Sequence, residues 1–489
     1  MIEPSDFRDP VLPAAVSANA WSGEDVDGAV PAAKSWGLRG MLPGVVKTLL
    51  PQAEADPADF RDERVGWGLV LPDNPDIPPE ARARADDAPE PIRELLESRR
   101  PAARVLRYNV NPNEAVLSLR DYAIDKPIQI SGSRPGSRDG DLPMYLLLYG
   151  GPDALPWELQ YQLNANRRVG RLHLTGDALA NYVTALLGNW SDSAARYDSP
   201  VVWAVDHGGD DITHLMRTAV AAGIATRIAA DTDMPGGIFL DGSAATATHA
   251  QLLDALVDNS PALVATTSHG MTGPLGGGHE EELAANLGLL VDGLHATLDV
   301  EELLRRWKPD GAIWYAHACC SAGTSTRTGL LDLFPDDSRV ARVLRGVGVV
   351  GPAVAPLPTA LLGASRPARA FVGHVEPTFD WTLSSPFTGQ PLTDSIVTAV
   401  YDRLCLGKPV GLAFDEPFRH IGELAAAHEN AVGVFNQSLS PGSVTAAVYT
   451  KLAWLDRQST VILGDPTVAI PLPTRDDRPA PADVAPRRK

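Results

Sequence analysis

Cysteine is scarce in this chain of 489 residues, which contains only Cys319, Cys320 and Cys405. Two of these are sequence neighbours, which do not readily form a disulfide with each other, so a disulfide-stabilised framework is excluded. The first ten residues (MIEPSDFRDP) also lack the basic and then apolar run of a secretion signal. We therefore expect a cytoplasmic protein, because a reactive thiol stays reduced in that compartment.

Basic residues and long apolar runs are also in short supply. The 42 Lys and Arg residues face 61 Asp and Glu residues, which gives a formal net charge of −19. This balance disfavours nucleic acids and anionic membranes as partners, since their phosphates attract Lys and Arg. The most apolar stretch, 343–362, is interrupted by Arg345 and three prolines, so no membrane-spanning helix is predicted.

The chain divides by composition into four parts. Residues 1–105 are rich in Pro, Asp and Glu, and we interpret them as an N-terminal extension that packs on the main body. From residue 106 onward, apolar runs that end in Gly-rich loops alternate with helical patterns, which predicts an α/β fold with a mostly parallel sheet covered on both faces. We assign a first α/β subdomain to 106–197 and a second to 198–472. The Pro-, Asp- and Arg-rich residues 473–489 are expected to be disordered.

Seven apolar runs predict buried strands. They are 144–149, 200–206, 261–268, 312–319, 346–355, 370–375 and 460–463. Thr248 with Gln251, and Asp299 with Glu302, have the spacing of capping boxes and predict helix starts. Ligand sites in such folds lie at the carboxyl ends of the parallel strands, where we expect the functional site.

Two of these runs deliver a His and a Cys, each near a glycine. The run 261–268 leads into His269-Gly270, and about 50 residues later the run 312–319 leads into Cys320-Ser-Ala-Gly, as in caspase-type enzymes. A thiol is nucleophilic as the thiolate, and a nearby His removes its proton or pairs with it. The pattern predicts a cysteine protease in which His269 is the acid/base.

The doubled cysteine leaves two candidates for the nucleophile. A glycine follows Cys320 at the usual spacing of three, and strand alternation directs the two thiols to opposite faces, so only one can meet His269. We predict Cys320 as the nucleophile and keep Cys319 as the alternative. The backbone N–H groups of Gly270 and Cys320 are the predicted oxyanion donors, and glycine at 270 allows close backbone approach.

These residues resemble the caspase-like (clan CD) cysteine peptidases, in which one strand ends in His-Gly and a later one in Ala-Cys-x-x-Gly or a close variant. Further segments at 145–156 with 169–171, at 373–377 and at 463–466 resemble the gingipain-like branch. The resemblance covers about residues 140–470. It implies a three-layer sandwich of two stacked α/β subdomains, endopeptidase catalysis in the second, a protein or peptide substrate, and neither cofactor nor metal.

Members of this clan select substrates by the residue before the scissile bond, often through an acidic pocket that accepts Arg or Lys. The candidates for such a pocket in this chain are Asp206, Asp210, Asp211, Glu376 and Asp380. The resemblance therefore implies a preference for a basic residue before the scissile bond. An intracellular, controlled protease in the manner of bacterial caspase homologues fits the missing secretion signal and allows for a regulatory protein partner.

Other functions remain as alternatives. The same fold could serve as a catalytically silent scaffold or sensor. A zinc site of His317, Cys319 and Cys320 lacks CxxC spacing and a fourth ligand, and His317 is more simply a packing residue or a partner of the site. A serine hydrolase is disfavoured because no Gly-x-Ser-x-Gly motif occurs. His207 and the Gly-Gly-Asp-Asp that follows it are interpreted as a surface turn.

Overall fold

The computed structural model separates into two compact units, residues 1–54 and residues 55–489. The first unit is described only through β1 (Ala15–Val16) and β2 (Val30–Pro31), which pair in antiparallel fashion. The second unit holds all other elements. Apart from β1 and β2, the structure describes residues 54–109, 118–326, 328–385, 388–439 and 441–472. The predicted disordered segment 473–489 lies outside the described residues.

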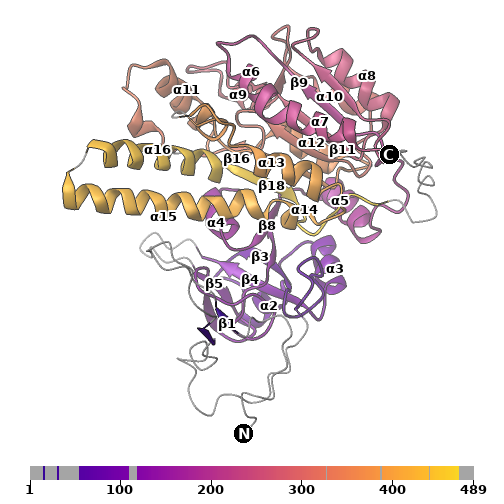
Figure 1. Ribbon diagram of the computed structural model, residues 1–489. Coiled ribbons are helices and arrows are strands. Elements are labelled where there is room, and N and C mark those ends of the chain that lie inside the picture. Colours follow the sequence, from indigo (N-terminus) through magenta and orange to yellow (C-terminus); the bar gives the residue numbers. More distant parts are fainter. Residues whose placement is uncertain are drawn as a thin grey trace. The chain divides into compact units, whose positions relative to one another are not determined.

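The second unit is built on one twelve-stranded sheet (Figure 1). In sheet order its strands are β10 (Ile238–Asp241), β9 (Val201–Ala204), β11 (Leu263–Thr267), β14 (Ile313–His317), β17 (Ala370–His374), β18 (Thr460–Gly464), β8 (Arg168–Leu172), β7 (Tyr145–Tyr149), β3 (Trp67–Pro72), β4 (Ala103–Tyr108), β5 (Ser118–Asp121) and β6 (Lys126–Gln129). Neighbours from β10 to β17 are parallel, and so are those from β18 to β4. β18 is antiparallel to β17, so two halves of opposite direction meet there, and β5 and β6 complete the second half as antiparallel strands.

The N-terminal boundary of the α/β part differs from the prediction. β3 and β4 begin inside the span 1–105 that we interpreted as an extension, yet they are strands of the sheet, next to β7. Their apolar runs are short and bordered by Pro- and Asp-rich loops, which hides them in the sequence. The Trp67 indole N–H donates to Asp465 at 3.2 Å, so this region is held directly to the segment after β18.

The predicted strand at 346–355 is mostly wrong. Residues 339–348 form α11 (Arg339–Gly348), whose first turn is capped by the Ser338 hydroxyl, which accepts from the Ala341 N–H at 3.1 Å. The start of the predicted run belongs to this helix, whose buried positions Ala341, Leu344 and Val347 repeat at helical spacing, and Val349 and Val350 lie in the turn that follows it. Only β16 (Ala353–Val354) remains extended, and it pairs with β15 (Gly323–Thr324).

Helices pack on both faces of the sheet, as in a three-layer α/β arrangement (Figure 1). They are α2 (Pro79–Arg84), α3 (Glu90–Ser98), α4 (Trp157–Asn164), α5 (Gly176–Leu187), α6 (Ile212–Met216), the π-helical turn η2 (Arg217–Ala221), α7 (Ala222–Ala230), α8 (His249–Asn259), α9 (Glu280–Asn286), α10 (Val300–Arg306), η3 (Leu331–Leu333), α12 (Pro356–Gly363), η4 (Asp380–Thr382), α13 (Asp394–Val397), the π-helical turn η5 (Thr398–Arg403), α14 (Val410–Ala413), α15 (Asp415–Ser438) and α16 (Pro441–Gln458). Both predicted helix caps are present: Thr248 and Gln251 form a capping box on α8, and Asp299 accepts from the Glu302 N–H on α10. α15 and α16 pack against each other as an antiparallel pair.

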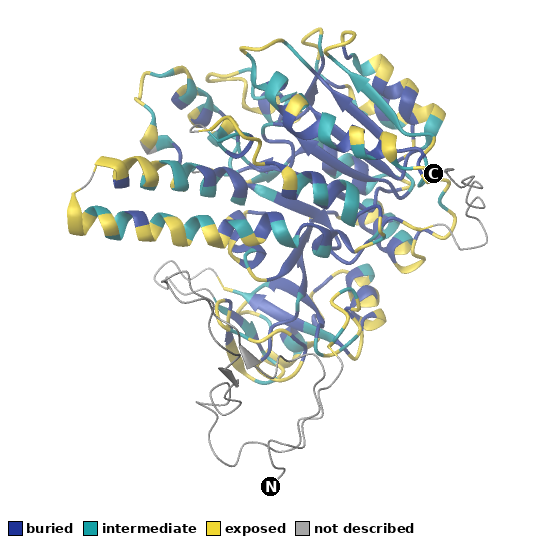
Figure 2. Cartoon of the chain, viewed as in Figure 1, coloured by how far each residue is buried: buried dark blue, intermediate teal, exposed yellow. Residues whose placement is uncertain are grey.

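The core follows the central strands of the sheet, which are buried (Figure 2). All residues of β9, β11, β14 and β17 are buried, as expected for parallel strands covered on both faces. The described helices include none that is long and apolar enough to cross a membrane.

Candidate active site

The His- and Cys-bearing segments leave the sheet at the same edge. β11 and β14 are parallel neighbours, and Thr267 is paired with His317 at their carboxyl ends. β9 lies on the other side of β11 and ends level with it, because Ala204 pairs with Thr267. The loops that follow β9, β11 and β14 therefore meet at one edge, as the sequence predicted.

Gly270 lies directly against the backbone of Cys319. It belongs to β12 (His269–Gly270), which pairs with β13 (Leu290–Val291) beyond the end of the main sheet. A Cβ placed on Gly270 would lie 1.9 Å from the Cys319 carbonyl oxygen, so no larger residue fits without displacing the turn that carries the cysteines. This contact agrees with the expected need for glycine at 270.

Cys320, the predicted nucleophile, faces the interior. Its side chain is fully buried in an apolar cluster with Leu287, Val343 and Val347. Burial raises the pKa of its thiol well above the ordinary value. Its N–H donates to the Glu376 carbonyl at 3.1 Å, so this group is occupied and does not suit the predicted oxyanion role.

Strand alternation does not decide which thiol faces His269, because β14 ends before Cys319 and Cys320. β14 stops at His317, and the Ser321 N–H donates to Ala318 O at 3.3 Å, which closes a turn. Cys320 has φ of 54° in that turn, a left-handed conformation that residues other than glycine rarely adopt. The extended geometry and the glycine spacing used for the prediction therefore do not apply at Cys320.

Cys319 is the cysteine that lies at the sheet edge, next to Gly270. The residue is partly exposed, and its Sγ donates to the Thr378 carbonyl at 3.6 Å. Burial of the thiol raises its pKa to about 11, and hydrogen bonding with the backbone of Thr378, Cys319 and Gly270 acts in the opposite direction. Geometry thus favours Cys319, the alternative nucleophile, over Cys320.

His269 is held by Asp211, one of the carboxylates predicted for a substrate pocket. The Asp211 Oδ2 lies 3.0 Å from His269 Nε2, and the two side chains are about one-third exposed, at 32% and 35%. Burial alone would raise the pKa of Asp211, but hydrogen bonds from Thr213 and from His269 lower it to about 2. The hydrogen bond between the charged carboxylate and Nε2 fixes the orientation of the His269 ring.

Aspartate is a typical N-cap residue, so a helix cap at Asp211 is readable from the sequence, whereas its contact with His269 is not. Asp211 is the N-cap of α6 and accepts from the Thr213 N–H at 2.8 Å. The pairing with His269 depends on β9 and β11 being neighbours in the sheet, which sequence patterns do not specify. Among the described residues, His269 Nδ1 has no hydrogen-bond partner, and it is the ring nitrogen left to act on a thiol or substrate.

The other carboxylates predicted for the pocket do not converge. Asp206 is nearly buried and lies 3.0 Å from His214 Nδ1. Asp210 and Asp380 are exposed. Glu376 accepts from the Thr328 hydroxyl at 2.6 Å, and burial raises its pKa to about 7. These four carboxylates therefore sit in separate environments.

Three imidazole rings stack beside the site. His207 lies 4.3 Å from His295 and 5.8 Å from His269, measured between ring centroids. Burial, and then the neighbouring His295, lower the pKa of His207. The interpretation of His207 as part of a surface turn did not predict this stack. The three rings come from segments that follow β9, β11 and β13, and sequence patterns do not show that these segments meet.

Asp456 of α16 holds the loop that faces Cys319. It accepts from the hydroxyls of Thr378 at 2.9 Å and Thr382 at 2.5 Å, and from the Phe379 N–H at 3.1 Å. Burial raises the pKa of Asp456 to about 6. Because the Thr378 carbonyl accepts from Cys319, the position of α16 is linked to the surroundings of the thiol.

His317 lies behind the site rather than in it. It is fully buried, its Nδ1 lies 2.9 Å from the Tyr315 hydroxyl, and its ring contacts His374 edge-on. Burial lowers the pKa of His317 to about 4. Within the described part of the chain, no group of three or more His, Cys, Asp or Glu side chains is arranged to hold a metal ion.

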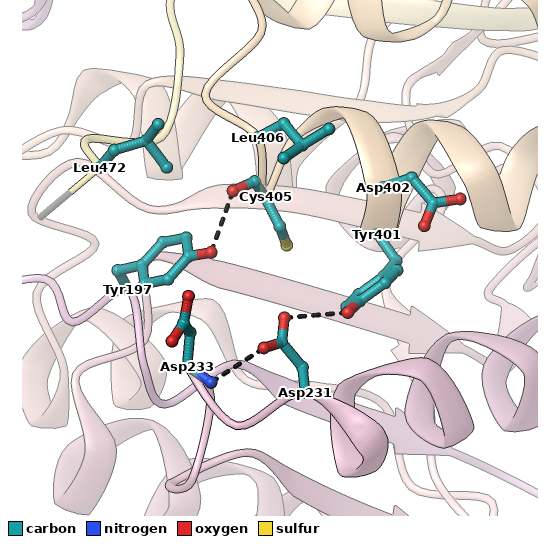
Figure 3. Close-up of a pocket in the computed structure, with 8 residues that line it drawn as sticks. All are labelled: Tyr197, Asp231, Asp233, Tyr401, Asp402, Cys405, Leu406 and Leu472. Atoms are coloured by element: carbon teal, nitrogen blue, oxygen red, sulfur yellow. Dashed lines mark hydrogen bonds between the residues drawn. The ribbon is translucent and has the colours of Figure 1, made fainter. Parts of the chain in front are cut away.

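A separate cavity of about 240 Å³ surrounds the third cysteine. Figure 3 shows Tyr401 donating to Asp231 at 2.9 Å and Tyr197 donating to the Cys405 carbonyl at 3.0 Å. Burial raises the pKa of the Cys405 thiol to about 12, which makes it a poor nucleophile. This cavity contains none of the predicted site residues.

Known proteins add no further constraint. No protein-family model, curated protein or solved structure matches the chain significantly. The assignment of function therefore depends on the geometry of the site.

Proposed function

We propose that the chain is a cysteine endopeptidase of the caspase-like type, with a Cys319 nucleophile, a His269 acid/base and an Asp211 that orients His269. The main support is the contact of Gly270 with Cys319. It places a His-Gly segment beside a partly exposed cysteine at the carboxyl edge of parallel strands. The gingipain-like sandwich implied by the sequence is part of this proposal, and the α/β sheet described above is compatible with it.

In this mechanism His269 acts as a general base. The Cys319 thiol is protonated because its pKa is raised to about 11, so its proton passes to His269 as the sulfur attacks the scissile carbonyl carbon. The developing oxyanion accepts a hydrogen bond from the Gly270 N–H. His269 then protonates the departing amine, and a water molecule, deprotonated by His269, hydrolyses the thioester and releases Cys319.

A catalytically silent scaffold is the second candidate. It is favoured by one observation, the burial that raises the pKa of the Cys319 thiol to about 11 and so keeps the thiol in its protonated, less reactive form. The two candidates differ in whether a substrate-like ligand makes Cys319 react.

Labelling with a thiol-directed peptidyl probe separates the candidates. We expect the wild type and Cys320→Ala to label, and Cys319→Ala and His269→Ala to lose labelling. Loss confined to Cys320→Ala would restore the nucleophile predicted from the sequence. Equal labelling of all four proteins would refute the endopeptidase. A structural check by circular dichroism ensures that a loss of labelling reflects chemistry rather than unfolding.

The preference for a basic residue before the scissile bond stays a prediction. Asp210 is the exposed carboxylate nearest in sequence to Asp211, and Asp380 is exposed on the loop that follows β17. A fluorogenic peptide panel tests it, and fastest cleavage after Asp or a small apolar residue would refute it.

A further inference from the structure

A groove of about 910 Å³ lies beside the candidate active site. One wall is the loop 271–277, which continues directly from Gly270, and the other is α11. Met271 lines the groove one residue beyond the glycine that contacts Cys319, and Val343 lines it while packing against the cluster that contains Cys320. The loop that forms this wall therefore leads directly out of the site, and the groove lining does not include Gly270, Cys319 or His269.

The α11 wall of the groove is strongly basic. Arg339, Arg342 and Arg345 recur every third residue along the helix, so they follow one side of it. Arg345 is paired with Asp336, whereas Arg339 and Arg342 have no ion-pair partner among the described residues. One carboxylate, Glu280, lines the opposite side. This concentration of positive charge contrasts with the chain's net charge of −19.

The remaining surface of the groove is apolar, and there is open space next to Gly276 and Gly277. Leu275 and Val349 line the groove and are 40% and 61% exposed. Leu275 lies over Gly346, where a Cβ would meet its Cδ2 at 2.5 Å. A Cβ on Gly276 or Gly277 would meet no atom within 4 Å. Apolar surface combined with unpaired guanidinium groups suits a peptide that carries both apolar and acidic side chains.

We propose that this groove binds an extended acidic stretch of the substrate, flanking the residue cleaved, with carboxylates on Arg339 and Arg342 and apolar side chains on Leu275 and Val349. The inference rests on the proposed endopeptidase function and adds the class of substrate to it. Nucleic acid is the less suitable polyanion, because the net negative charge of the chain repels a long phosphate backbone.

Binding is measured on Cys319→Ala, so that it does not depend on turnover. The probes are a short fluorescein-labelled peptide rich in Glu and Leu, and a matched peptide in which every Glu is Gln. We expect the acidic peptide to bind more tightly, with affinity that falls as salt is raised. Replacing both Arg339 and Arg342 by Gln should weaken it about twofold to thirtyfold, as expected for two exposed charge pairs.

Arg93→Gln is the matched control. Arg93 is exposed on α3 and has no ion-pair partner among the described residues, so its loss should leave binding unchanged. The proposal would be overturned if the two peptides bound equally. It would also be overturned if Arg93→Gln weakened binding as much as the replacement of both Arg339 and Arg342. Competition by single-stranded DNA as strong as by the acidic peptide would also overturn it, since it would show a general anion site.

Turnover by the wild type separates this proposal from the function on which it rests. Selective binding of the acidic peptide without cleavage of any peptide would support the proposed role of the groove and refute the endopeptidase function. Equally fast cleavage of the acidic peptide and its Gln counterpart would support the endopeptidase function and refute acidic-peptide binding in the groove.

Discussion

The contact between Gly270 and Cys319 provides the sharpest test of the site, through Gly270→Ala. The added Cβ would lie 1.9 Å from the Cys319 carbonyl oxygen, whereas heavy atoms in contact prefer about 3.5–4.0 Å. The neighbouring segments must therefore separate by more than about 1 Å. A displacement of about 1 Å between catalytic groups can reduce the rate about 100-fold, and overpacking of this kind costs about 1–3 kcal/mol of stability.

The assay is the rate of labelling by a thiol-directed peptidyl probe, with urea unfolding measured in parallel. Gly422→Ala is the matched control, because Gly422 lies within α15 and a Cβ there would meet no atom within 4 Å. We expect this control to keep the wild-type labelling rate and to gain up to about 1 kcal/mol of stability, since alanine favours a helix. Labelling of Gly270→Ala at the wild-type rate would refute the proposed alignment of His269 with Cys319.

Three further predictions concern protonation. Burial raises the pKa of Glu376 from 4.5 to about 7, so its contribution to stability is present below pH 4.5 and is lost as pH rises to about 7. Glu376→Gln should therefore gain up to about 3 kcal/mol relative to the wild type between pH 4 and pH 8, measured by urea unfolding, and a constant difference would contradict this. The hydrogen bond from Arg217 lowers the pKa of Asp241 from 3.8 to about 2. Because solvent screens this pair near the surface, we expect up to about 1 kcal/mol of stability present above pH 4 to be lost toward pH 2 in the wild type and not in Asp241→Asn. Finally, alkylation of Cys319 by iodoacetamide is measured in a protein that also carries Cys320→Ser and Cys405→Ser. We expect the rate to rise with pH without a plateau below about pH 10, because the pKa of the Cys319 thiol is about 11. A plateau near neutral pH would show a preformed thiolate.

Local patterns predicted the strands near the site well, because their apolar runs are long and bounded by turns. The runs 261–268 and 312–319 became β11 and β14, and both lead to the predicted edge. The short β3 and β4 were missed, since Pro- and Asp-rich loops surround them. The valines of 346–355 predict a strand, but α11, which is capped by Ser338, extends to Gly348, and only Ala353–Val354 are extended.

The choice between the cysteines required three-dimensional information. Periodicity assumes a continued strand, but the chain turns after His317, and Cys320 enters the core. The contacts of Asp211 with His269 and of Asp456 with Thr378 join segments that are distant in sequence. Such pairs follow from the order of strands in the sheet, which residue types and spacing alone do not determine.

The position of β18 has a consequence for how the molecule is made. It is the last described strand in chain order, yet it lies between β17 and β8 in the middle of the sheet. During synthesis, both halves emerge from the ribosome before the strand that joins them. α16, which carries Asp456, also emerges late and directly precedes β18. The loop beside Cys319 thus receives its anchor only late in synthesis, so under the proposed endopeptidase function a partly synthesised chain should be inactive.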